Sequence, residues 1–293
     1  MSDFIGNFRK VFARKGEFNT LDVSTQLTLG NQSLVTNKGS IFFVNSNASN
    51  ANDSNSGKSW SSPLATLDGA INKCTANNGD MILLAPGHSE TYSTTGAKAI
   101  FDVAGITVVS VGKGDNRATF NFGHTGATFT VSANSIVLAG LLFVAAVDQV
   151  TTYGTISGSD CELIDCETRD VTDKEVVDAF TCTGARLKVS RHYHNGYTSG
   201  DANARVFKLN GVSGALFEEC RFRTKVTTAV INFVTTACTN VIVKNSVFYI
   251  ASSTNLAKTV VDTVTGSTWA VCDNCFDLGK GTGFSGGSGS ALA

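Results

Sequence analysis

A ladder of short apolar segments repeats along most of this 293-residue chain and restricts the fold more than any other sequence feature. Each segment carries one apolar anchor, and successive anchors lie 25 to 30 residues apart. The anchors are Val108, Leu138, Leu163, Val189, Phe217, Val243 and Val271. A fixed period in this range is typical of solenoids, in which similar coils stack on one another. We therefore expect equivalent residues to contact each other from coil to coil.

The pattern within each segment indicates strands. Apolar residues alternate over five to seven positions and then stop at Gly, Asn, Ser or Asp, whereas a helix would repeat them every three or four positions. Val, Ile and Phe are common in the segments and suit a pleated surface. We predict an all-β parallel β-helix, with a further coil at 81–84 and a fully buried strand in the apolar run 136–147.

Two further columns of side chains follow each anchor. The column five positions later is mostly aromatic and is predicted to line the interior: Phe143, Thr168, His194, Phe222, Phe248 and Phe276. The column three positions later is small or mixed, as expected near a bend: Val111, Leu141, Cys166, His192, Cys220, Ser246 and Asn274. Burial of the apolar columns, at about 25 cal/mol per Å², would supply most of the stability.

The two ends of the stack expose open strand edges, which promote aggregation unless they are covered. Ser62 as N-cap and Pro63 at the first position predict a short capping helix over 63–74, with Leu64, Leu67, Ile71 and Cys74 on one face. Residues 281–293 are rich in Gly and Ser and predict a flexible tail. The β-helix domain is thus expected over 39–280.

One stretch near the start resembles a known family. Ile41-Phe42-Phe43-Val44, a polar stretch to Trp60, Pro63–Ile71 and Gly79–Gly87 follow each other as in right-handed parallel β-helix proteins of the pectate-lyase-like superfamily, in particular those encoded by tailed bacteriophages. The resemblance covers roughly residues 40–276. It implies a right-handed solenoid, and it implies little about activity because this fold hosts lyases, hydrolases and inert virion proteins.

Residues 1–38 do not follow the ladder and are expected to form an attachment helix and arm. An amphipathic helix is predicted over 3–14, with Ser2 as a possible N-cap. A helix this short is marginal alone, so its apolar face either packs on the β-helix of its own chain or anchors the chain to a partner such as a capsid surface. The residues proposed for attachment are Phe4, Ile5, Phe8, Arg9, Val11, Phe12 and Arg14. Residues 17–40 predict an extended arm with short strands.

The net charge and the length of the apolar runs limit the kinds of partner that the chain is expected to bind. The net charge of −1 offers no global field for nucleic acid or membrane binding, and no apolar run reaches the length of a membrane span. The first twenty residues lack the apolar stretch of a secretory signal. We therefore expect assembly in the host cytoplasm with the eight cysteines as free thiols.

Acidic residues are the strongest candidates for catalysis, because a pair of carboxylates can cleave a glycosidic bond. Eight of them cluster in the sequence: Asp160, Glu162, Asp165, Glu167, Asp170, Asp173, Glu175 and Asp178. The register directs Glu162 and Glu167 outward among Arg169, Lys174 and solvent, so we interpret the cluster as a solvated face, as we do Glu218 and Glu219. The catalytic motifs of polygalacturonases are missing; the nearest fragment is Gly123-His124-Thr125-Gly126.

Metal and phosphate sites are also not expected. His192 and His194 share a side of their strand, and the register makes them buried, hydrogen-bonded histidines. Cys272-Asp273-Asn274-Cys275 is a lone CxxC without a second ligand pair for zinc. Gly112-Lys113-Gly114-Asp115 predicts a turn rather than a phosphate loop, since no helix follows it. We expect no metal, no cofactor and no catalytic residue.

These features favour a non-enzymatic virion structural protein, most simply a capsid decoration or cement protein on the capsid surface. Its expected partners are the major capsid protein or another virion protein, and copies of itself in a homotrimer. Two alternatives remain open. A tailspike or polysaccharide depolymerase requires an outward acidic pair in a groove, and a glycan-binding adhesin with weak host contact requires exposed aromatic residues such as Trp60 or Tyr197.

Overall fold

The structure is a computed structural model that describes residues 27–29, 32–34, 39–196, 203–250, 258–272, 274–277 and 284–285. The chain divides into two compact units, Met1–Asn37 and Lys38–Ala293. In the first unit, β1 (Leu27–Leu29) pairs with β2 (Gln32–Leu34) as an antiparallel hairpin. The predicted helix over 3–14 lies outside the described residues.

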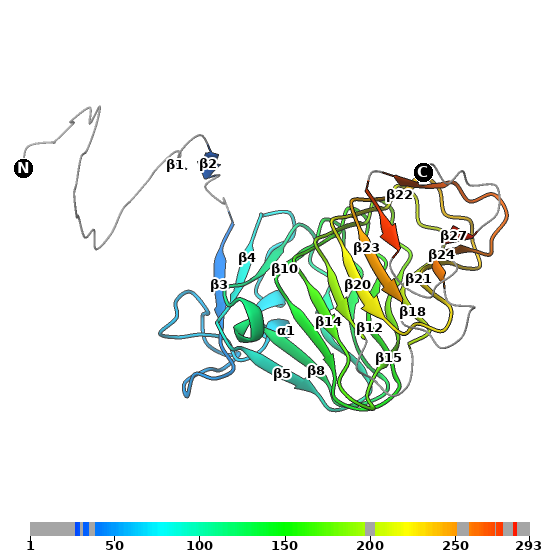
Figure 1. The fold of residues 1–293 in the computed structure, drawn as a ribbon. Coiled ribbons are helices and arrows are strands. Elements are labelled where there is room, and N and C mark those ends of the chain that lie inside the picture. Colours follow the sequence, from blue (N-terminus) through cyan, green and yellow to red (C-terminus); the bar gives the residue numbers. More distant parts are fainter. Residues whose placement is uncertain are drawn as a thin grey trace, which may run out of the picture. The chain divides into compact units, whose positions relative to one another are not determined.

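The second unit is a parallel β-helix in which each complete coil contributes one strand to each of three sheets, and the first sheet has one further strand at the start of the stack (Figure 1). The first sheet consists of β3 (Ile41–Val44), β4 (Met81–Leu84), β7 (Thr107–Ser110), β10 (Val137–Ala139), β13 (Glu162–Ile164), β16 (Lys188–Ser190), β19 (Leu216–Glu218), β22 (Val241–Lys244) and β25 (Trp269–Cys272). The second consists of β5 (Ser89–Tyr92), β8 (Thr119–Phe122), β11 (Leu142–Ala145), β14 (Glu167–Arg169), β17 (Tyr193–Asn195), β20 (Arg221–Thr224), β23 (Val247–Ile250) and β26 (Phe276–Asp277). The third consists of β6 (Gly96–Phe101), β9 (Ala127–Val131), β12 (Val150–Ile156), β15 (Val176–Cys182), β18 (Arg205–Leu209), β21 (Ala229–Phe233), β24 (Lys258–Asp262) and β27 (Phe284–Ser285).

The strand register confirms the predicted ladder. Val108 pairs with Leu138, Leu138 with Leu163, and Leu163 with Val189 on neighbouring strands. The same column continues through Phe217 and Val243 to Val271, and it extends backwards through Ile82 to Phe42. The anchors whose side chains are described are all buried. A 25- to 30-residue period therefore corresponds to one full coil.

Each predicted segment is in fact two strands joined by a sharp corner. The corner residue has positive φ in coil after coil, from 49° at Asn245 to 72° at Gly140. Its amide donates to a carbonyl of the next coil, as from Asp165 to Ser190 and from Arg191 to Glu218. Gly, Asn and Asp tolerate this conformation best. The prediction of a single strand in the apolar run 136–147 is therefore wrong. This run contains two strands, β10 and β11, joined at the Gly140 corner.

The interior is filled by stacked columns. Phe120 and Phe143 stack with ring centroids 6.0 Å apart, and Phe222 and Phe248 do so at 5.1 Å. Between these aromatic pairs the same column holds Thr168, as predicted from its spacing. The prediction that Phe276 lines the interior is wrong. The corner before β26 is one residue longer, so Asp277 pairs with Phe248 and Phe276 is 53% exposed.

The cap at the start of the stack is shorter than predicted. The helix α1 covers only Leu67–Ile71, and its N-cap is Thr66, whose hydroxyl accepts from the Gly69 amide at 3.0 Å. Ser62 and Pro63 do not begin the helix, because Leu64 is extended and forms a parallel bridge to Val44. Leu67 and Ile71 are buried against the first coils, as expected. None of the described helices has the length and apolar character needed to cross a membrane.

The third sheet was not anticipated from the sequence, although it supplies much of the core. Its interior column includes Phe129, Gly154, Phe180 and Phe207. The Phe129 ring occupies the space where a Cβ on Gly154 would lie, so this glycine makes room for a large neighbour. At the other end, β27 pairs with β24, which places Phe284–Ser285 in the sheet; the rest of the predicted tail lies outside the described residues.

Candidate functional site

The corner between β7 and β8 is longer than the equivalent corners of later coils. Phe120 follows the anchor Val108 by twelve residues, whereas Phe143 follows Leu138 by five. The extra residues form the 111–118 loop, which contains the 3₁₀ turn Gly114–Asn116. The prediction that Val111 lies in an interior column is wrong: Val111 is 46% exposed, and Ala118 is buried in its place.

The loop is held in shape by its own bonds. A side chain at Gly112 would collide with the carbonyl of Asn116, so glycine permits the tight closure. The Ser110 hydroxyl donates to the Gly112 carbonyl at 3.3 Å and accepts from the Ala118 amide at 2.8 Å, which ties the two ends together. The Arg117 Nε donates to the Gly114 carbonyl at 3.0 Å. These contacts restrict the loop before any ligand is present.

Ion pairs fasten the loop over the coils that follow. Arg117 Nη2 lies 3.4 Å from Glu167 Oε2, and Arg169 Nε lies 2.8 Å from Glu167 Oε1. Arg169 also reaches back to Asp115, with Nη1 3.2 Å from Oδ1. Since β8, β11 and β14 are successive strands of the second sheet, these pairs bridge two coil spacings. Glu167 is only 4% exposed, so the predicted solvated position for this residue is wrong.

The folded-over loop encloses a cleft of about 430 Å³ on the outer side of the first sheet. Its lining combines an apolar floor with a polar rim: Val109, Ser110, Gly112, Lys113, Gly114, Arg117, Ala139, Gly140 and Asp165. Val109 and Ala139 are neighbours in register on β7 and β10. A concave site of this size with a few polar groups is the usual form of a small-molecule site.

The carboxylates beside the cleft already have partners. Asp165 accepts two hydrogen bonds from Arg191, Nε to Oδ1 at 2.7 Å and Nη2 to Oδ2 at 2.9 Å, and these bonds hold the pKa of Asp165 below its ordinary value. Glu167 is shared between Arg117 and Arg169. Lys113 is exposed and forms no ion pair with another described residue. The charge of Lys113 helps to lower the pKa of Asp165, but no direct ion pair holds its ammonium group in the cleft.

The remaining acidic residues of the predicted cluster do not converge on one groove. Asp160 forms a two-bonded pair with Arg186 at an exposed corner, with both distances 2.6 Å. Asp178 is buried beside the third sheet and pairs with Arg205 at 2.7 Å and Lys208 at 3.3 Å. Together with Asp165 and Glu167, four members of the cluster are thus committed to ion pairs across coils. Those at the coil corners support the stack rather than present free acid groups.

Two members of the cluster are buried and accept hydrogen bonds from uncharged side chains. Asp170 is 2% exposed, accepts from Asn203 Nδ2 at 2.8 Å and lies 3.3 Å from the Tyr153 hydroxyl. Burial raises the pKa of Asp170 to about 7. Glu175 is fully buried and bonded to the side-chain amide of Gln149. The prediction of a solvated face is therefore wrong for both residues.

The histidines lie where the register placed them. His192 and His194 are fully buried, and both bond to Thr168 Oγ1, with distances of 3.2 Å from Nε2 and 2.7 Å from Nδ1 respectively. Burial lowers the pKa of each to about 3, which confirms neutral core histidines. Within the described part of the chain, no group of three or more His, Cys, Asp or Glu side chains could hold a metal ion.

The cysteines whose side chains are described form no disulfide. Cys166, Cys220 and Cys275 occupy one column, and each Sγ lies 3.3 to 3.6 Å from the carbonyl of the anchor in the preceding coil. Burial raises the pKa of Cys166 and Cys220 to about 12, which keeps them protonated and unreactive at neutral pH. Cys275 replaces Asn274 in the predicted column, because the corner carries one extra residue.

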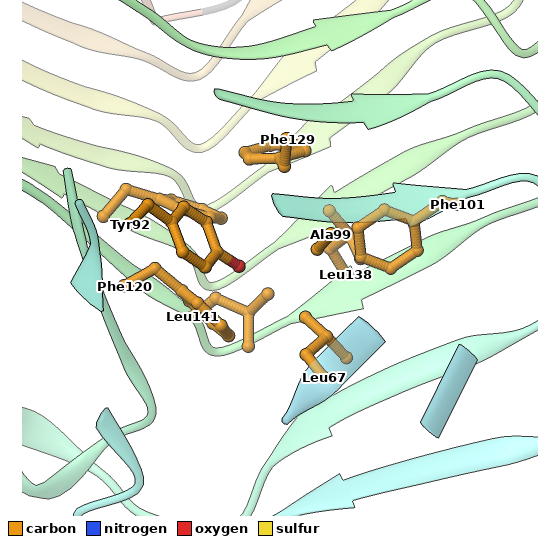
Figure 2. Close-up of a pocket in the computed structure, with 9 residues that line it drawn as sticks. Leu67, Tyr92, Ala99, Phe101, Phe120, Phe129, Leu138 and Leu141 are labelled. Atoms are coloured by element: carbon orange, nitrogen blue, oxygen red, sulfur yellow. The ribbon is translucent and has the colours of Figure 1, made fainter. Parts of the chain in front are cut away.

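A second cavity lies inside the first coils and is a packing void. Its volume is about 10 Å³, barely enough for one water molecule. Figure 2 shows the Tyr92 hydroxyl pointing into this space between apolar side chains. The lining is otherwise apolar: Leu67, Ala99, Phe101, Phe120, Phe129, Leu138, Leu141 and Phe143. Such a void has neither the size nor the polar groups to bind a ligand.

The predicted attachment residues, from Phe4 to Arg14, lie outside the described residues, as does Tyr197. Trp60 is 43% exposed and packs edge-on against Phe43 with ring centroids 4.6 Å apart. The cleft residues were overlooked because Gly112–Asp115 was interpreted only as a turn. The extra spacing between Val108 and Phe120 was the available signal.

Comparison with known proteins gives two solved structures with a similar arrangement. A rhamnogalacturonan lyase is 12% identical, with a TM-score of 0.48 over 79% of this chain and 74% of its own. The crystal structure of pectate lyase Pel9A is 15% identical, with a TM-score of 0.46 over 84% of this chain and 79% of its own. No protein family and no curated protein matches the sequence. The chain is an all-β parallel β-helix similar in outline to these polysaccharide lyases.

Proposed function

We propose that this chain is a non-enzymatic structural protein of a tailed-phage virion, most simply a capsid decoration protein. Residues 1–38 attach it to the major capsid protein or another virion protein, and the β-helix is displayed on the capsid surface. The attachment contacts come from Phe4, Ile5, Phe8, Arg9, Val11, Phe12 and Arg14. The protein assembles in the host cytoplasm and acts as a homotrimer, without cofactor or metal.

One observation carries the proposal: the outer face of the first sheet is apolar over its first five strands. On β3, β4, β7, β10 and β13, the outward and partly exposed residues are Ile41, Phe43, Met81, Leu83, Val109, Val137, Ala139 and Ile164. Only Thr107 and Glu162 interrupt this surface. A contiguous apolar patch on a protein surface marks a contact with another macromolecule. We name it the apolar flank.

The rest of the same face has the opposite character. On β16, β19 and β22, Glu218 lies between two lysines, with Oε1 3.6 Å from Lys188 Nζ and Oε2 3.2 Å from Lys244 Nζ. A partner would bury the apolar flank and leave this charged part in water. Further copies of the chain are the simplest partner, because a threefold oligomer brings the same surface of all three copies together at its axis.

The oligomer is tested by sedimentation of the full chain. The double substitution Val137→Lys and Ile164→Lys places two charges on the apolar flank and is expected to convert trimer to monomer. Leu216→Lys is the matched control, because Leu216 lies in the same outward column as Val137 but on the charged part. A wild-type protein that is monomeric at all concentrations would contradict this part of the proposal.

The virion role is tested on particles. Electron microscopy of purified phage particles, with the protein present as the full chain or as residues 39–293, is expected to show density on the capsid only with the full chain. Density that persists without residues 1–38 would refute attachment through that segment. Release of reducing sugar ends from host surface polysaccharide by the purified protein would instead favour the tailspike or depolymerase alternative.

A further inference from the structure

We propose that the cleft under the 111–118 loop binds a small ligand in which an oxyanion group is joined to a compact apolar body. The oxyanion, a carboxylate or a phosphate or sulfate ester, would contact Lys113 and Arg117. The apolar body would lie on Val109 and Ala139. This site does not involve the attachment segment. It shares Val109 and Ala139 with the apolar flank, and it stands whether or not the chain is a virion protein.

The charges around the cleft favour an anion. Four cations and three carboxylates surround it: Lys113, Arg117, Arg169 and Arg191 against Asp115, Asp165 and Glu167. All three carboxylates are in ion pairs with arginines, whereas Lys113 acts on Asp165 through its charge and is in no direct ion pair with a described residue. A bound cation would find each of these carboxylates already paired. A bound anion would give Lys113 a direct partner.

Arg117 can donate hydrogen bonds to the ligand while it remains paired with Glu167. Its Nε is bonded to the Gly114 carbonyl and its Nη2 to Glu167, so its guanidinium has further N–H groups that these bonds do not use. The Arg117 side chain is 19% exposed, and its guanidinium is held by these two partners. A pre-positioned arginine loses little freedom on binding an oxyanion.

The loop backbone adds neutral donors. The amides of Lys113 and Gly114 donate to no other described residue, and both residues are exposed. Gly114 has φ +60° and no atom within 4 Å of the position of a Cβ, so the loop is open at this point.

The floor selects the rest of the ligand. Val109 and Ala139 present aliphatic side chains, and Gly140 follows with φ +72° at the corner. A purely ionic ligand would leave this apolar surface in water, while a ligand with an apolar face would cover it, at about 25 cal/mol per Å². The volume of about 430 Å³ accommodates a body of the size of one six-membered ring with its substituent.

The test uses benzoate, phenyl phosphate and phenyl sulfate as anionic probes on the full chain, with acetate and benzyl alcohol as partial probes. Amide chemical shifts in NMR titrations locate the site, and calorimetry measures affinity. Benzoate or one of the two esters is expected to shift the amides of Gly112, Gly114 and Gly140. Acetate lacks the ring and benzyl alcohol lacks the charge, so both are expected to bind more weakly. The tightest of the three anionic probes identifies the oxyanion.

Substitutions separate the site from general charge effects. Lys113→Gln removes an exposed cation and is expected to weaken the anionic probes about tenfold, the loss of one charge-assisted bond. Ala139→Glu, which puts a carboxylate on the floor, is expected to abolish binding. Lys98→Gln is the matched control, because Lys98 lies on β6 in the third sheet. Equal loss in Lys98→Gln, unchanged affinity in Lys113→Gln, or equal affinity for benzyl alcohol would each overturn the proposal.

Discussion

The interior of the first coils and that of the middle coils are built on the same column but differ in chemistry. In the first coils the column holds Phe120 and Phe143, which stack in a dry core. In the next two coils it holds Thr168 and then His194, within a chain of buried hydrogen bonds. The geometry of a coil therefore does not require apolar residues inside. Buried polar side chains here bond to partners in their own coil or the next, although His192 Nδ1 has no hydrogen-bond partner.

The polar part is a connected network rather than a set of separate contacts. Thr168 bonds to both His192 and His194, and Asn203 links His194 to Asp170. Every coil spacing in this region is bridged by at least one side-chain bond in addition to the strand ladders. Such a network is worth more when intact than its separate bonds, and loses more when one member is removed. The stability of the aromatic part depends instead on the volume of the side chains that fill it.

The largest expected effect lies in the aromatic part. Phe143→Ala removes a ring that contacts Phe120, Phe129, Tyr153 and Phe180. We expect a loss of about 3 to 5 kcal/mol in the free energy of unfolding, because neighbouring strands keep the cavity from collapsing. Urea denaturation followed by circular dichroism measures it. Val144→Ala, on the outward side of the same strand, is the control and should cost far less.

A smaller loss is expected from the polar part when its shape is kept. Thr168→Val is nearly isosteric but removes the hydroxyl shared by both histidines, leaving buried nitrogens without a partner. We expect about 1 to 3 kcal/mol in the same denaturation assay. Thr155→Val, on the outer face of the third sheet, should change stability by less than about 0.5 kcal/mol. If Thr168→Val were neutral, the network would not stabilise the middle coils.

The polar part should also make stability depend on pH, with two opposing contributions. The pKa of His192 and His194 is lowered to about 3 by burial, so the folded state excludes protons that the unfolded state binds, and stability falls as pH decreases from about 6.5 towards 3. The pKa of Asp170 is raised to about 7 by burial, so its contribution favours the folded state at low pH and is lost as pH rises from about 4 to 7.

A substitution of Asp170 separates its contribution to the pH dependence of stability from that of the histidines. Asp170→Asn removes the contribution that opposes the histidines, so the acid-induced loss between pH 6.5 and 4 should become steeper, by up to about 1.4 kcal/mol per pH unit. Denaturation midpoints at pH 7, 6, 5 and 4 for both proteins give the comparison. Parallel curves for wild type and variant would show that Asp170 does not change its protonation on folding.

The smallest effect is expected outside the core. Arg186→Gln breaks the two-bonded pair with Asp160 at an exposed corner, where water and salt screen the charges. The denaturation midpoint should stay unchanged within error, while NMR titration should show the pKa of Asp160, which Arg186 now lowers, rising towards its ordinary value. A clear drop in the midpoint would mean that corner pairs, and not only interior columns, hold the coils together.

The stacked columns could be predicted from the sequence because they depend on spacing alone. Anchors one coil apart must meet if the chain winds at a constant period, and Leu138, Leu163 and Val189 do so. The third sheet was missed because its strands, such as β15 and β18, were separated from the anchors by turns of varying length. Errors at Val111 and Phe276 have the same cause: a longer corner shifts every later residue.

The cleft could not be predicted because it depends on contacts between coils. Nothing local to Gly112 or Lys113 indicates that the loop folds back over the sheet. That direction is set by Glu167, more than fifty residues later, which draws Arg117 and Arg169 together. The acidic cluster was likewise misinterpreted, since the side-chain environment of Asp170 and Glu175 is determined by partners from other coils.

The 111–118 loop also has a consequence for engineering. Seven additional residues are accommodated at one corner while β7 and β8 keep the register of their neighbours, since hydrogen bonds along the stack run only between adjacent strands. Corners such as those at Asp165 and Asn245 are therefore candidates for grafted peptides. An epitope or an enzyme recognition sequence could be inserted at the corners of successive coils. The distance between neighbouring copies would then be set by the distance between coils.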